Sequence, residues 1–421
     1  MSASFLGAAT VRGADLQLNV AIARQLLQPA DQPLWCIARN AAVGRRLVAA
    51  RDIPAGTLVF QERPLVVAET ASAPAGLQFG PMPVAAALLR DAENAASNTL
   101  QSNPVQGSQF QSLQSRFTAS LKAASAPLPS PARIEWAIGL ASTNTHASSD
   151  EPRRSVLGVL SSMMEHACNP TATISIGPAA QGSTLSLHTQ RDLRAGEPLS
   201  ISYTIRYAPT AERRRVLLAS HGFLCRCERC DSQPEWVRAF RCPVAGCEGA
   251  ASPLTSLKRC RRLVCDECID EGRPGKYQLD DAAWAALIAA EECETLSEEV
   301  LGVLHPYHHK MVVLYIQNLA KVPLVQRSEL FCQFADANAR LTGNGNDVLV
   351  AKYLQMAAHS LHSAGEHAEA AEKFGTAAEV YAAALGPTSE PALRCRAAER
   401  AIRSDAPGEF GSQPALLAAP L

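Results

Sequence analysis

The sequence predicts a mixed α+β protein with a β-rich N-terminal half, a cysteine-rich middle and an all-helical C-terminal lobe. Residues 43–67 contain two short apolar runs on either side of a Pro-Ala-Gly turn at 54–56, a pattern typical of strands. Cysteines cluster between residues 225 and 268, and apolar residues recur at helical spacing beyond residue 279. A chain of 421 residues is long enough for two or three structural units.

The N-terminal apolar segment, residues 43–67, is expected to form a β-hairpin whose turn lies at Pro54, Ala55 and Gly56. Residues 68–132 are then rich in Ala, Ser, Gln and Pro. This composition favours flexible loops around short helices. The sequence therefore predicts a segment after the first strands that is helical and partly disordered.

The charges nearly cancel, with 39 Lys and Arg residues and 40 Asp and Glu residues. This balance excludes a nucleic-acid-binding surface that extends over the whole protein. Basic clusters at 213–215 and 258–262 are interpreted as solvated helix faces. No apolar stretch is long enough to span a bilayer, and residues 1–35 lack the pattern of a secretory signal. We therefore expect a soluble protein of the cytoplasm or nucleus, with no membrane partner.

The cysteines indicate metal sites, because 13 is an odd number and most lie in tight clusters. Such clusters suit thiolate sites in a reducing compartment better than a disulfide framework. Cys225, Cys227 and Cys230 supply three thiolates, one short of a closed tetrahedral zinc site. Four isolated cysteines are interpreted as small buried side chains: Cys36, Cys293, Cys332 and Cys395.

A second cysteine group has the spacing of a zinc ribbon within residues 240–270. Its two ligand pairs are Cys242 with Cys247, and Cys265 with Cys268. Cys260 remains as an alternative ligand in another pairing. The zinc would pin a loop-rich segment that is too short to form a core of its own.

The C-terminal lobe, residues 279–403, is expected to be entirely helical. Asp280 and Asp281 are candidate N-caps, and apolar periodicity continues near 307–321, 325–341 and 348–385. The spacing around a turn at Gly365 is similar to a tetratricopeptide-like helical hairpin. We expect this lobe to bind partner proteins, and residues 404–421 to form a disordered tail.

Three fragments in fixed order resemble one known family. They read Glu-His-Ala-Cys-Asn-Pro at 165–170, Gly-Glu-Pro-Leu-Ser-Ile-Ser-Tyr at 196–203 and Cys-Arg-Cys-Glu-Arg-Cys at 225–230. Together they resemble the SET domain and post-SET segment of protein lysine methyltransferases, in particular the SET-and-MYND group. No cysteine occurs between Cys36 and Cys168, so the MYND finger is absent.

The resemblance implies an order of units along the chain. These are the N-terminal half of the SET domain (36–67), an insert (68–155), the C-terminal half (156–207), a post-SET zinc segment (208–231), the ribbon (240–270), the helical lobe and the tail. It also implies S-adenosyl-L-methionine and Zn²⁺ as cofactors, and a lysine side chain of a protein as substrate.

The resemblance further implies the roles of individual residues. Tyr203 matches the catalytic tyrosine, Cys168 completes the zinc site, and His221 lies in the lysine channel. The residues matched to the cofactor are Gly44, Arg45, Asn144, Glu165, His166 and Phe223. Methyl transfer to an amine is an in-line displacement, so the protein mainly aligns two reactants and excludes water.

Four positions depart from the family pattern. Arg46 replaces a glycine, Glu165 and Thr171 each replace an asparagine, and His221 replaces a tyrosine. Two functions therefore stay open: a protein-lysine N-methyltransferase, and a non-catalytic interaction module with structural zinc. A metal-binding nucleic-acid protein is a third interpretation, which the neutral net charge disfavours.

Overall fold

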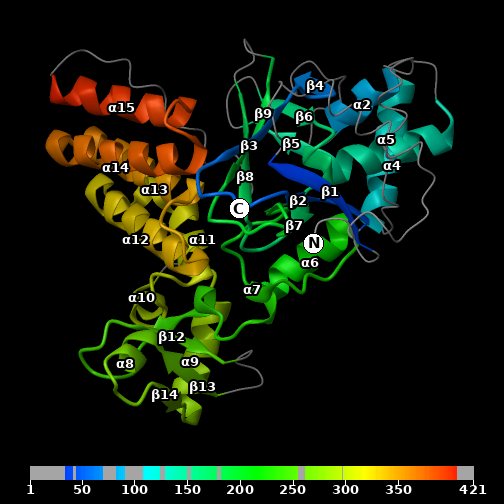
Figure 1. Ribbon diagram of the computed structural model, residues 1–421. Coiled ribbons are helices and arrows are strands. Elements are labelled where there is room, and N and C mark those ends of the chain that lie inside the picture. The colour runs from blue at the N-terminus through cyan, green and yellow to red at the C-terminus, as the bar shows by residue number, and fades with distance from the viewer. Residues whose placement is uncertain are drawn as a thin grey trace.

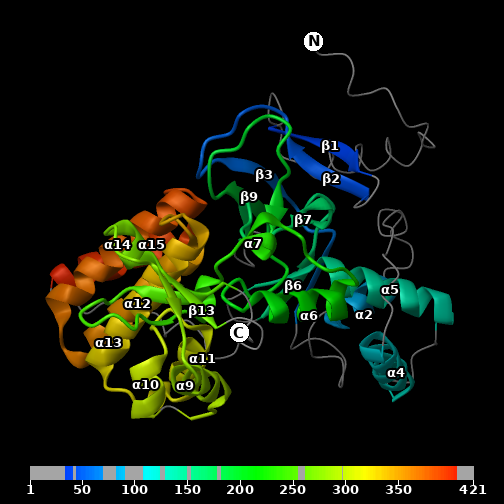
Figure 2. The same ribbon diagram turned by 90° about the horizontal axis from the view of Figure 1, so that it is seen from below.

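The computed structural model describes residues 34–40, 44–69, 82–90, 108–123, 129–148, 153–177, 182–254, 261–295 and 297–404. Short strands lie at the centre, with the insert helices on one side and the C-terminal helices on the other (Figures 1 and 2). The prediction of a mixed α+β protein is confirmed. Predictions about the tail beyond residue 404, the disordered parts of the insert and Cys260 lie outside the described residues.

The first strands belong to two different sheets. The strands are β1 (Trp35–Asn40), β2 (Gly44–Ala49), β3 (Leu58–Glu62), β8 (Ala172–Ile176) and β9 (Leu185–Thr189). β1 pairs antiparallel with β2, whereas β3 pairs with β9, which also pairs with β8. The predicted hairpin over 43–67 is therefore wrong, although both apolar runs are strands and Gly56 adopts the expected turn with a φ of 73°.

Long-range contacts replace that hairpin. Ile53 forms a β-bridge with Leu193, and the Ala55 N–H donates to Asp192 Oδ1 at 2.8 Å. The loop that contains Gly56 thus lies against the loop that contains Gly196. Pairing with a distant strand satisfies the backbone donors that a local hairpin would have satisfied.

The insert packs on a third sheet. Its elements are β4 (Val66–Glu69), α2 (Met82–Arg90), α4 (Ser108–Ala123), α5 (Pro131–Asn144), β5 (Thr145–Ala147) and β6 (Arg154–Leu157). β6 pairs with both β4 and β5. Ser130 caps α5 by accepting from the Arg133 N–H. Met82, Phe117 and Ile138 are fully buried in the shared core of this unit.

Glu62 joins the two halves of the central region. Its carboxylate is 1% exposed and accepts the N–H groups of Val159, Leu160 and Ser161 at 2.8–2.9 Å. This contact holds the short helix η1 (Ser161–Met163) directly before strand β7 (Glu165–His166). β7 runs parallel to β10 (Ser200–Ile201), so the second and first sequence fragments lie side by side.

Helix α6 (Thr210–His221) and helix α7 (Glu228–Asp231) follow β10. α6 ends at Gly222, which has a φ of 75° and whose N–H donates to the Leu218 carbonyl. The left-handed turn at Gly222 reverses the chain and directs it toward the cysteines at 225–230. It also places His221 and Phe223 on either side of one glycine.

The cysteine-rich segment folds as an antiparallel sheet with small helices. Its elements are η3 (Trp236–Arg238), β11 (Phe240–Arg241), β12 (Ala250–Pro253), β13 (Arg262–Cys265), α8 (Asp266–Asp270) and β14 (Lys276–Gln278). The next helices are α9 (Asp281–Glu292), α10 (Glu298–Val303) and α11 (His309–Gln317). Asp280 is the N-cap of α9, as predicted, and accepts from the Ala283 N–H. Asp281 is the first residue of that helix.

The chain ends in a stack of helices. They are η4 (Leu319–Lys321), α12 (Leu324–Thr342), α13 (Val348–Ala364), α14 (His367–Leu385) and α15 (Glu390–Arg403). α12 to α15 each pack on the next (Figure 1). Gly343 and Gly365 end α12 and α13 in the left-handed conformation. None of the helices in the described ranges has the length and apolarity needed to cross a bilayer.

The isolated cysteines have different environments. Cys395 is buried in the core of the helix stack, as predicted. Cys36 is exposed on β1, so the prediction of burial is wrong there, because β1 lies in a two-stranded sheet that covers few of its side chains. Cys293 and Cys332 are half-buried.

Candidate active site and cysteine clusters

Tyr203 lies two residues beyond the end of β10. Its hydroxyl donates to the main-chain carbonyl of Met164, and its own N–H donates to His166 Nδ1 at 3.0 Å. Its ring stacks on His221, with centroids 4.8 Å apart and planes at 27°. Burial, and to a smaller extent the Glu165 carboxylate, raises the pKa of Tyr203 above its ordinary value, so the phenol is neutral near pH 7.

His166 contacts both Tyr203 and Cys168, one of the cysteines predicted to bind zinc. The Tyr203 N–H can only donate, so Nδ1 of His166 accepts and the imidazole proton lies on Nε2. Nε2 is 3.3 Å from Cys168 Sγ, which suits an N–H donor facing a thiolate. Burial lowers the pKa of His166 to about 4, and the ring is therefore neutral.

His221 and Phe223 complete an aromatic group around Tyr203. The Phe223 ring centroid is 5.9 Å from that of His166 and 6.4 Å from that of His221. His221 Nδ1 lies 2.7 Å from Ser220 Oγ, and burial lowers the pKa of the imidazole. A neutral imidazole thus occupies the position where the family pattern has a second tyrosine.

Arg46 and Glu165, two of the unusual residues, contact each other. Arg46 on β2 and Glu165 on β7 form an ion pair of 3.2 Å, with side chains 25% and 21% exposed. Gly44 and Arg45 lie at the start of the same strand, opposite Asn40 and Arg39 of β1. The third departure, Thr171, accepts the Ser200 N–H at 2.8 Å and so has a structural role.

A cavity of about 1770 Å³ separates the central strands from the helix stack. Tyr203, His221 and Asn144 line it from the central side. Helices α13, α14 and α15 form the opposite wall, which includes Lys352, Phe374 and Arg394. The Asn144 amide donates to the Leu140 carbonyl at 3.0 Å and to Thr143 Oγ1 at 2.8 Å.

The structure therefore separates the predicted site residues into two groups. Asn144, Tyr203 and His221 face the cavity, whereas the other residues matched to the cofactor do not line it: Gly44, Arg45, Glu165, His166 and Phe223. Ring contacts of His166 with Tyr203, and of Phe223 with His221, join the two groups.

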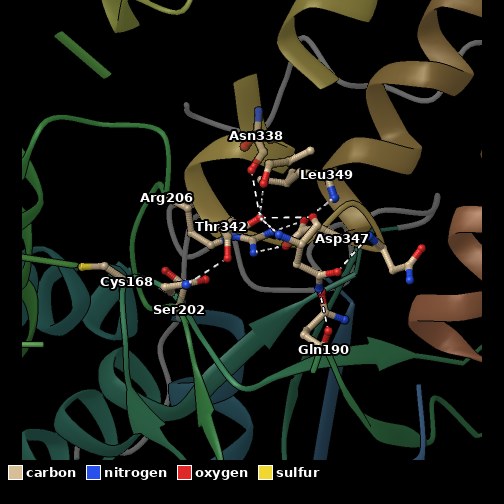
Figure 3. A network of polar contacts seen from close by, with 12 residues as sticks. Cys168, Gln190, Ser202, Arg206, Asn338, Thr342, Asp347 and Leu349 are labelled. Atoms are coloured by element: carbon tan, nitrogen blue, oxygen red, sulfur yellow. Dashed lines mark hydrogen bonds and ion pairs between the residues drawn. The ribbon is translucent and has the colours of Figure 1, made fainter. Parts of the chain in front are cut away.

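Polar contacts fix the segment around Tyr203 to the helix stack (Figure 3). Arg206 forms a two-fold ion pair with Asp347, with one contact of 2.6 Å, and the Asp347 side chain is only 2% exposed. Asn169, next to Cys168, donates to the Thr342 carbonyl at 3.1 Å. The Asp347 carboxylate also caps α13 through the Leu349 N–H at 2.8 Å.

Two groups of four cysteines have the geometry of tetrahedral metal sites. The first cluster consists of Cys168, Cys225, Cys227 and Cys230. Its Sγ atoms lie within 4.8 Å of one another, with contacts of 3.5 Å from Cys168 to Cys230 and 3.9 Å from Cys168 to Cys225. A tetrahedron with zinc–sulfur bonds of about 2.3 Å has sulfur–sulfur edges of about 3.8 Å, so the first cluster fits Zn²⁺.

The second cluster consists of Cys242, Cys247, Cys265 and Cys268. Its sulfur contacts are 3.8 Å from Cys242 to Cys268, 3.8 Å from Cys247 to Cys265 and 3.6 Å from Cys247 to Cys268. Two of the sulfurs come from the loop between β11 and β12, and the other two come from the end of β13 and from α8. This geometry also fits Zn²⁺.

Arg213 was not recognised in the sequence as part of a site. The prediction that residues 213–215 form a solvated face is wrong for Arg213, which is 1% exposed, and right for Arg215, whose side chain is 70% exposed. Arg213 Nε donates to Cys168 Sγ at 3.2 Å. The available signal was the spacing of four residues between Arg213 and the buried Leu217, which puts both on one helix face.

Comparisons with known proteins agree with the sequence fragments. The family model of the SET domain matches residues 44–204. Histone-lysine N-methyltransferase SET5 of Meyerozyma guilliermondii is 32% identical over 72 residues, which cover 17% of this chain and 15% of that protein. Histone-lysine N-methyltransferase SMYD3 of Homo sapiens is 35% identical over 72 residues, covering 17% of this chain and 16% of that protein.

A third relative is the SET domain-containing protein SmydA-8, isoform B, of Drosophila melanogaster, 26% identical over 125 residues. That match covers 28% of this chain and 27% of the fly protein. The matches thus span 15% to 27% of the length of these relatives.

Among solved structures, the SET domain of LSMT bound to lysine and AdoHcy aligns over 94% of this chain and 92% of that chain, at 12% identity and a TM-score of 0.39. An overlay this loose does not place individual side chains. The family match rests on the sequence, and residues 44–204 of this chain form a SET domain.

Proposed function

We propose that the protein is an S-adenosyl-L-methionine-dependent protein-lysine N-methyltransferase in which Tyr203 is the catalytic residue. The observation that supports this most directly is the environment of Tyr203. Its neutral hydroxyl is held by the Met164 carbonyl, its ring stacks on His221, and both side chains line the cavity of about 1770 Å³. A fixed, water-poor position of this kind suits the alignment of two reactants.

The residues around Tyr203 fit a positively charged methyl donor. S-Adenosyl-L-methionine, when bound, supplies a methyl group on a cationic sulfur. Aromatic faces and carboxylates attract cations, and Phe223, His221 and Glu165 provide such groups beside Tyr203. The residues proposed to hold the cofactor are Gly44, Arg45, Asn144, Glu165, His166 and Phe223.

The side chains that line the cavity would prepare the lysine amine. A free lysine has a pKa of about 10.4 and must lose its proton before it can attack. Burial in the cavity next to positive charge favours the neutral amine. The Tyr203 oxygen, whose proton goes to Met164, keeps lone pairs that can accept an amine N–H. The neutral His221 would form one wall of the lysine channel.

The two cysteine clusters would hold one Zn²⁺ each. In the first cluster, Cys168 follows β7 and the other three cysteines follow α6, so the metal would hold the post-SET segment against the strand that carries His166. In the second cluster the metal would stabilise the ribbon. All cysteines in the described ranges are free thiols, which fits a reducing compartment such as the cytoplasm or nucleus.

The substrate proposed for the cavity is a lysine-bearing segment of a protein. The wall formed by α13–α15 lies opposite Tyr203, so such a segment would contact both the SET domain and the helix stack. The tetratricopeptide-like part of the stack would bind partner proteins through its remaining surface.

Methyl transfer tests this proposal. Zinc-loaded protein is incubated with S-adenosyl-L-methionine labelled in the methyl group and with cell-extract proteins, and hydrolysed products are analysed for methyl-lysine. We expect labelled lysine with the native chain and with Tyr315→Phe, a control that does not line the cavity, and a loss of at least 100-fold with Tyr203→Phe. Equal labelling by Tyr203→Phe would refute the role of Tyr203. A native chain that labels nothing would favour the interaction module.

A further inference from the structure

We propose that Arg213 is a positioning residue of the first cluster, where its guanidinium hydrogen-bonds the zinc-binding sulfurs and compensates their negative charge. This inference rests on the zinc-binding part of the proposed function, and it concerns only the first cluster. According to this inference, the affinity of the first cluster for zinc depends on the buried Arg213 cation as well as on the four cysteines.

The contacts of Arg213 point to the sulfurs. Nε donates to Cys168 Sγ at 3.2 Å and Nη2 to Cys230 Sγ at 3.5 Å. The remaining donors bond Thr210 Oγ1 at 2.8 Å and the Ala208 carbonyl. Four bonds in different directions fix the planar guanidinium, so its position is set by the fold and not by the metal.

Charge explains why a cation is needed at this place. Four thiolates around one Zn²⁺ carry a net negative charge, and Cys168, Cys225 and Cys230 are buried. Burying uncompensated charge is costly, whereas a guanidinium stays charged in proteins and donates in a fixed geometry. Among the residues that the structure describes, Arg213 has an ion-pair contact with the Glu235 carboxylate at 3.9 Å, which is farther than Cys168 Sγ.

Two further arginines surround the first cluster but contact carbonyls instead of sulfurs. Arg229 Nη1 donates to the Cys168 carbonyl at 2.9 Å. Arg214 Nε donates to the Cys225 carbonyl at 2.9 Å, and Arg214 also pairs with Asp231 at 2.7 Å. Of these three arginines, Arg213 is therefore the one whose replacement removes hydrogen bonds to the cysteine sulfurs that would bind the metal.

The second cluster offers an internal comparison. Within the described ranges its sulfurs accept the Gly249 N–H at 3.4 Å, and no guanidinium hydrogen bond to them is present. Arg273 lies nearby, but its side chain is 37% exposed and pairs with Glu271. Water partly screens this charge, although it still attracts the thiolates of Cys268 and Cys247. Arg213 should thus affect one cluster and leave the other unchanged.

Chelator-induced alkylation separates the two clusters. Purified zinc-loaded protein is titrated with a chelator, treated with iodoacetamide and digested, and mass spectrometry reports the modification of each cysteine. The variants are Arg213→Met, Arg213→Lys and the control Arg273→Met. Zinc content is measured first by elemental analysis.

We expect two zinc ions in the native chain. Arg213→Met should release the first cluster at a chelator activity about 10- to 100-fold lower than in the native protein. Arg213→Lys, which keeps the charge, should show a smaller shift. The second cluster should respond as in the native protein in both Arg213 variants, and Arg273→Met should leave the first cluster unchanged.

Several outcomes would overturn the inference. It fails if Arg213→Met and Arg213→Lys both release the first cluster within threefold of the native protein. It also fails if both clusters shift equally, because Arg213 then acts through general stability. If Arg213→Met does not fold and is alkylated everywhere without chelator, the folded Arg213→Lys decides between these results. A native chain without zinc would instead refute the zinc proposal itself.

Discussion

Arg46 and Glu165 each depart from the family pattern, and they meet in an ion pair of 3.2 Å. The two residues are 119 positions apart, so the relation is invisible in the sequence. A charge introduced at one position is balanced by the opposite charge at the other, so neither partly buried side chain is left unpaired. We interpret the two departures as one coordinated change.

A double-mutant cycle tests this interpretation. Because both side chains are partly exposed, water screens the pair and we expect a coupling energy of about 0.5 kcal/mol between Arg46→Met and Glu165→Gln. Urea unfolding of the native chain, both single variants and the double variant gives this energy. Strictly additive losses would show that the two substitutions are independent.

His188 on β9 predicts a pH dependence of stability. It is 7% exposed, its Nδ1 has no partner among the described residues, and burial lowers its pKa from 6.5 to about 4. Below pH 6.5, His188 therefore becomes protonated in the unfolded chain, whereas in the folded chain it stays neutral until the pH approaches about 4. The free energy of unfolding falls as the pH falls. The loss between pH 7 and pH 5 should be about 2 kcal/mol.

The control for this prediction is His188→Gln, which cannot titrate. Urea unfolding at pH 7 and pH 5 should show that the variant loses about 2 kcal/mol less than the native chain over this interval. Parallel losses in the two proteins would mean that His188 is not buried as a neutral imidazole.

At the scale of residues, sequence reasoning found the groups that local motifs define. The cysteines at 225–230 and 242–268 and the tyrosine at 203 stand in short patterns that can be read directly. Arg213 was missed because its partners, Cys168 and Cys230, are distant in the sequence. In addition, three consecutive arginines on a helix are by composition expected to face solvent. The Met164 carbonyl was missed because a main-chain group carries no sequence signal.

At the scale of elements, the loop after β10 is fastened to the start of helix α13. Arg206, three residues beyond Tyr203, pairs with Asp347, which also caps α13 (Figure 3). The Arg206 side chain is 13% exposed and that of Asp347 is 2% exposed. One carboxylate therefore orients both the loop that carries Tyr203 and the first helix of the stack that lines the cavity.

Removal of that carboxylate should be strongly destabilising. Asp347→Ala leaves Arg206 without its charged partner and α13 without its cap, and we expect a loss of about 3–5 kcal/mol. Asp347→Ser can still cap the helix and should lose about 1 kcal/mol less. Glu390→Ala, which breaks an exposed pair with Arg394, should cost about 0.5 kcal/mol or less. Chemical denaturation that ranks the three variants differently would contradict this assignment.

The elements themselves were predicted unevenly. Helices in the C-terminal lobe followed from apolar periodicity and from a cap such as Asp280, because both are local properties. The strand pairing was not predictable, since β3 pairs with β9 more than 120 residues away and a turn at Gly56 suggests a nearby partner. Local turn chemistry specifies the reversal of the chain but not the strand that it joins.

At the scale of the whole molecule, the SET domain and the helix stack approach each other closely at Gly56. A Cβ at this position would lie 2.4 Å from the Ala383 carbonyl oxygen on α14. Gly196, on the neighbouring loop, also has a positive φ, but a methyl group added there would meet no atom within 4 Å. A substitution at Gly196 therefore introduces backbone strain alone, whereas a substitution at Gly56 introduces backbone strain together with a clash against the helix stack.

We expect Gly196→Ala to cost about 1 kcal/mol through backbone strain alone. Gly56→Ala should cost clearly more, because the added methyl group must also displace α14. Denaturant unfolding of both variants measures the difference, and small-angle scattering of Gly56→Ala should show a less compact particle. Equal costs and unchanged scattering would mean that the stack does not rest on this loop.

The measurement that tests the central claim most directly is calorimetric titration of the zinc-loaded chain with S-adenosyl-L-methionine, because it requires no knowledge of the substrate. The account predicts binding in the micromolar range with one site per chain, and loss of that binding in His166→Ala, whose imidazole accepts the Tyr203 N–H. A folded, zinc-loaded chain that gives no binding heat and no protection of its thermal unfolding by the cofactor would contradict the claim.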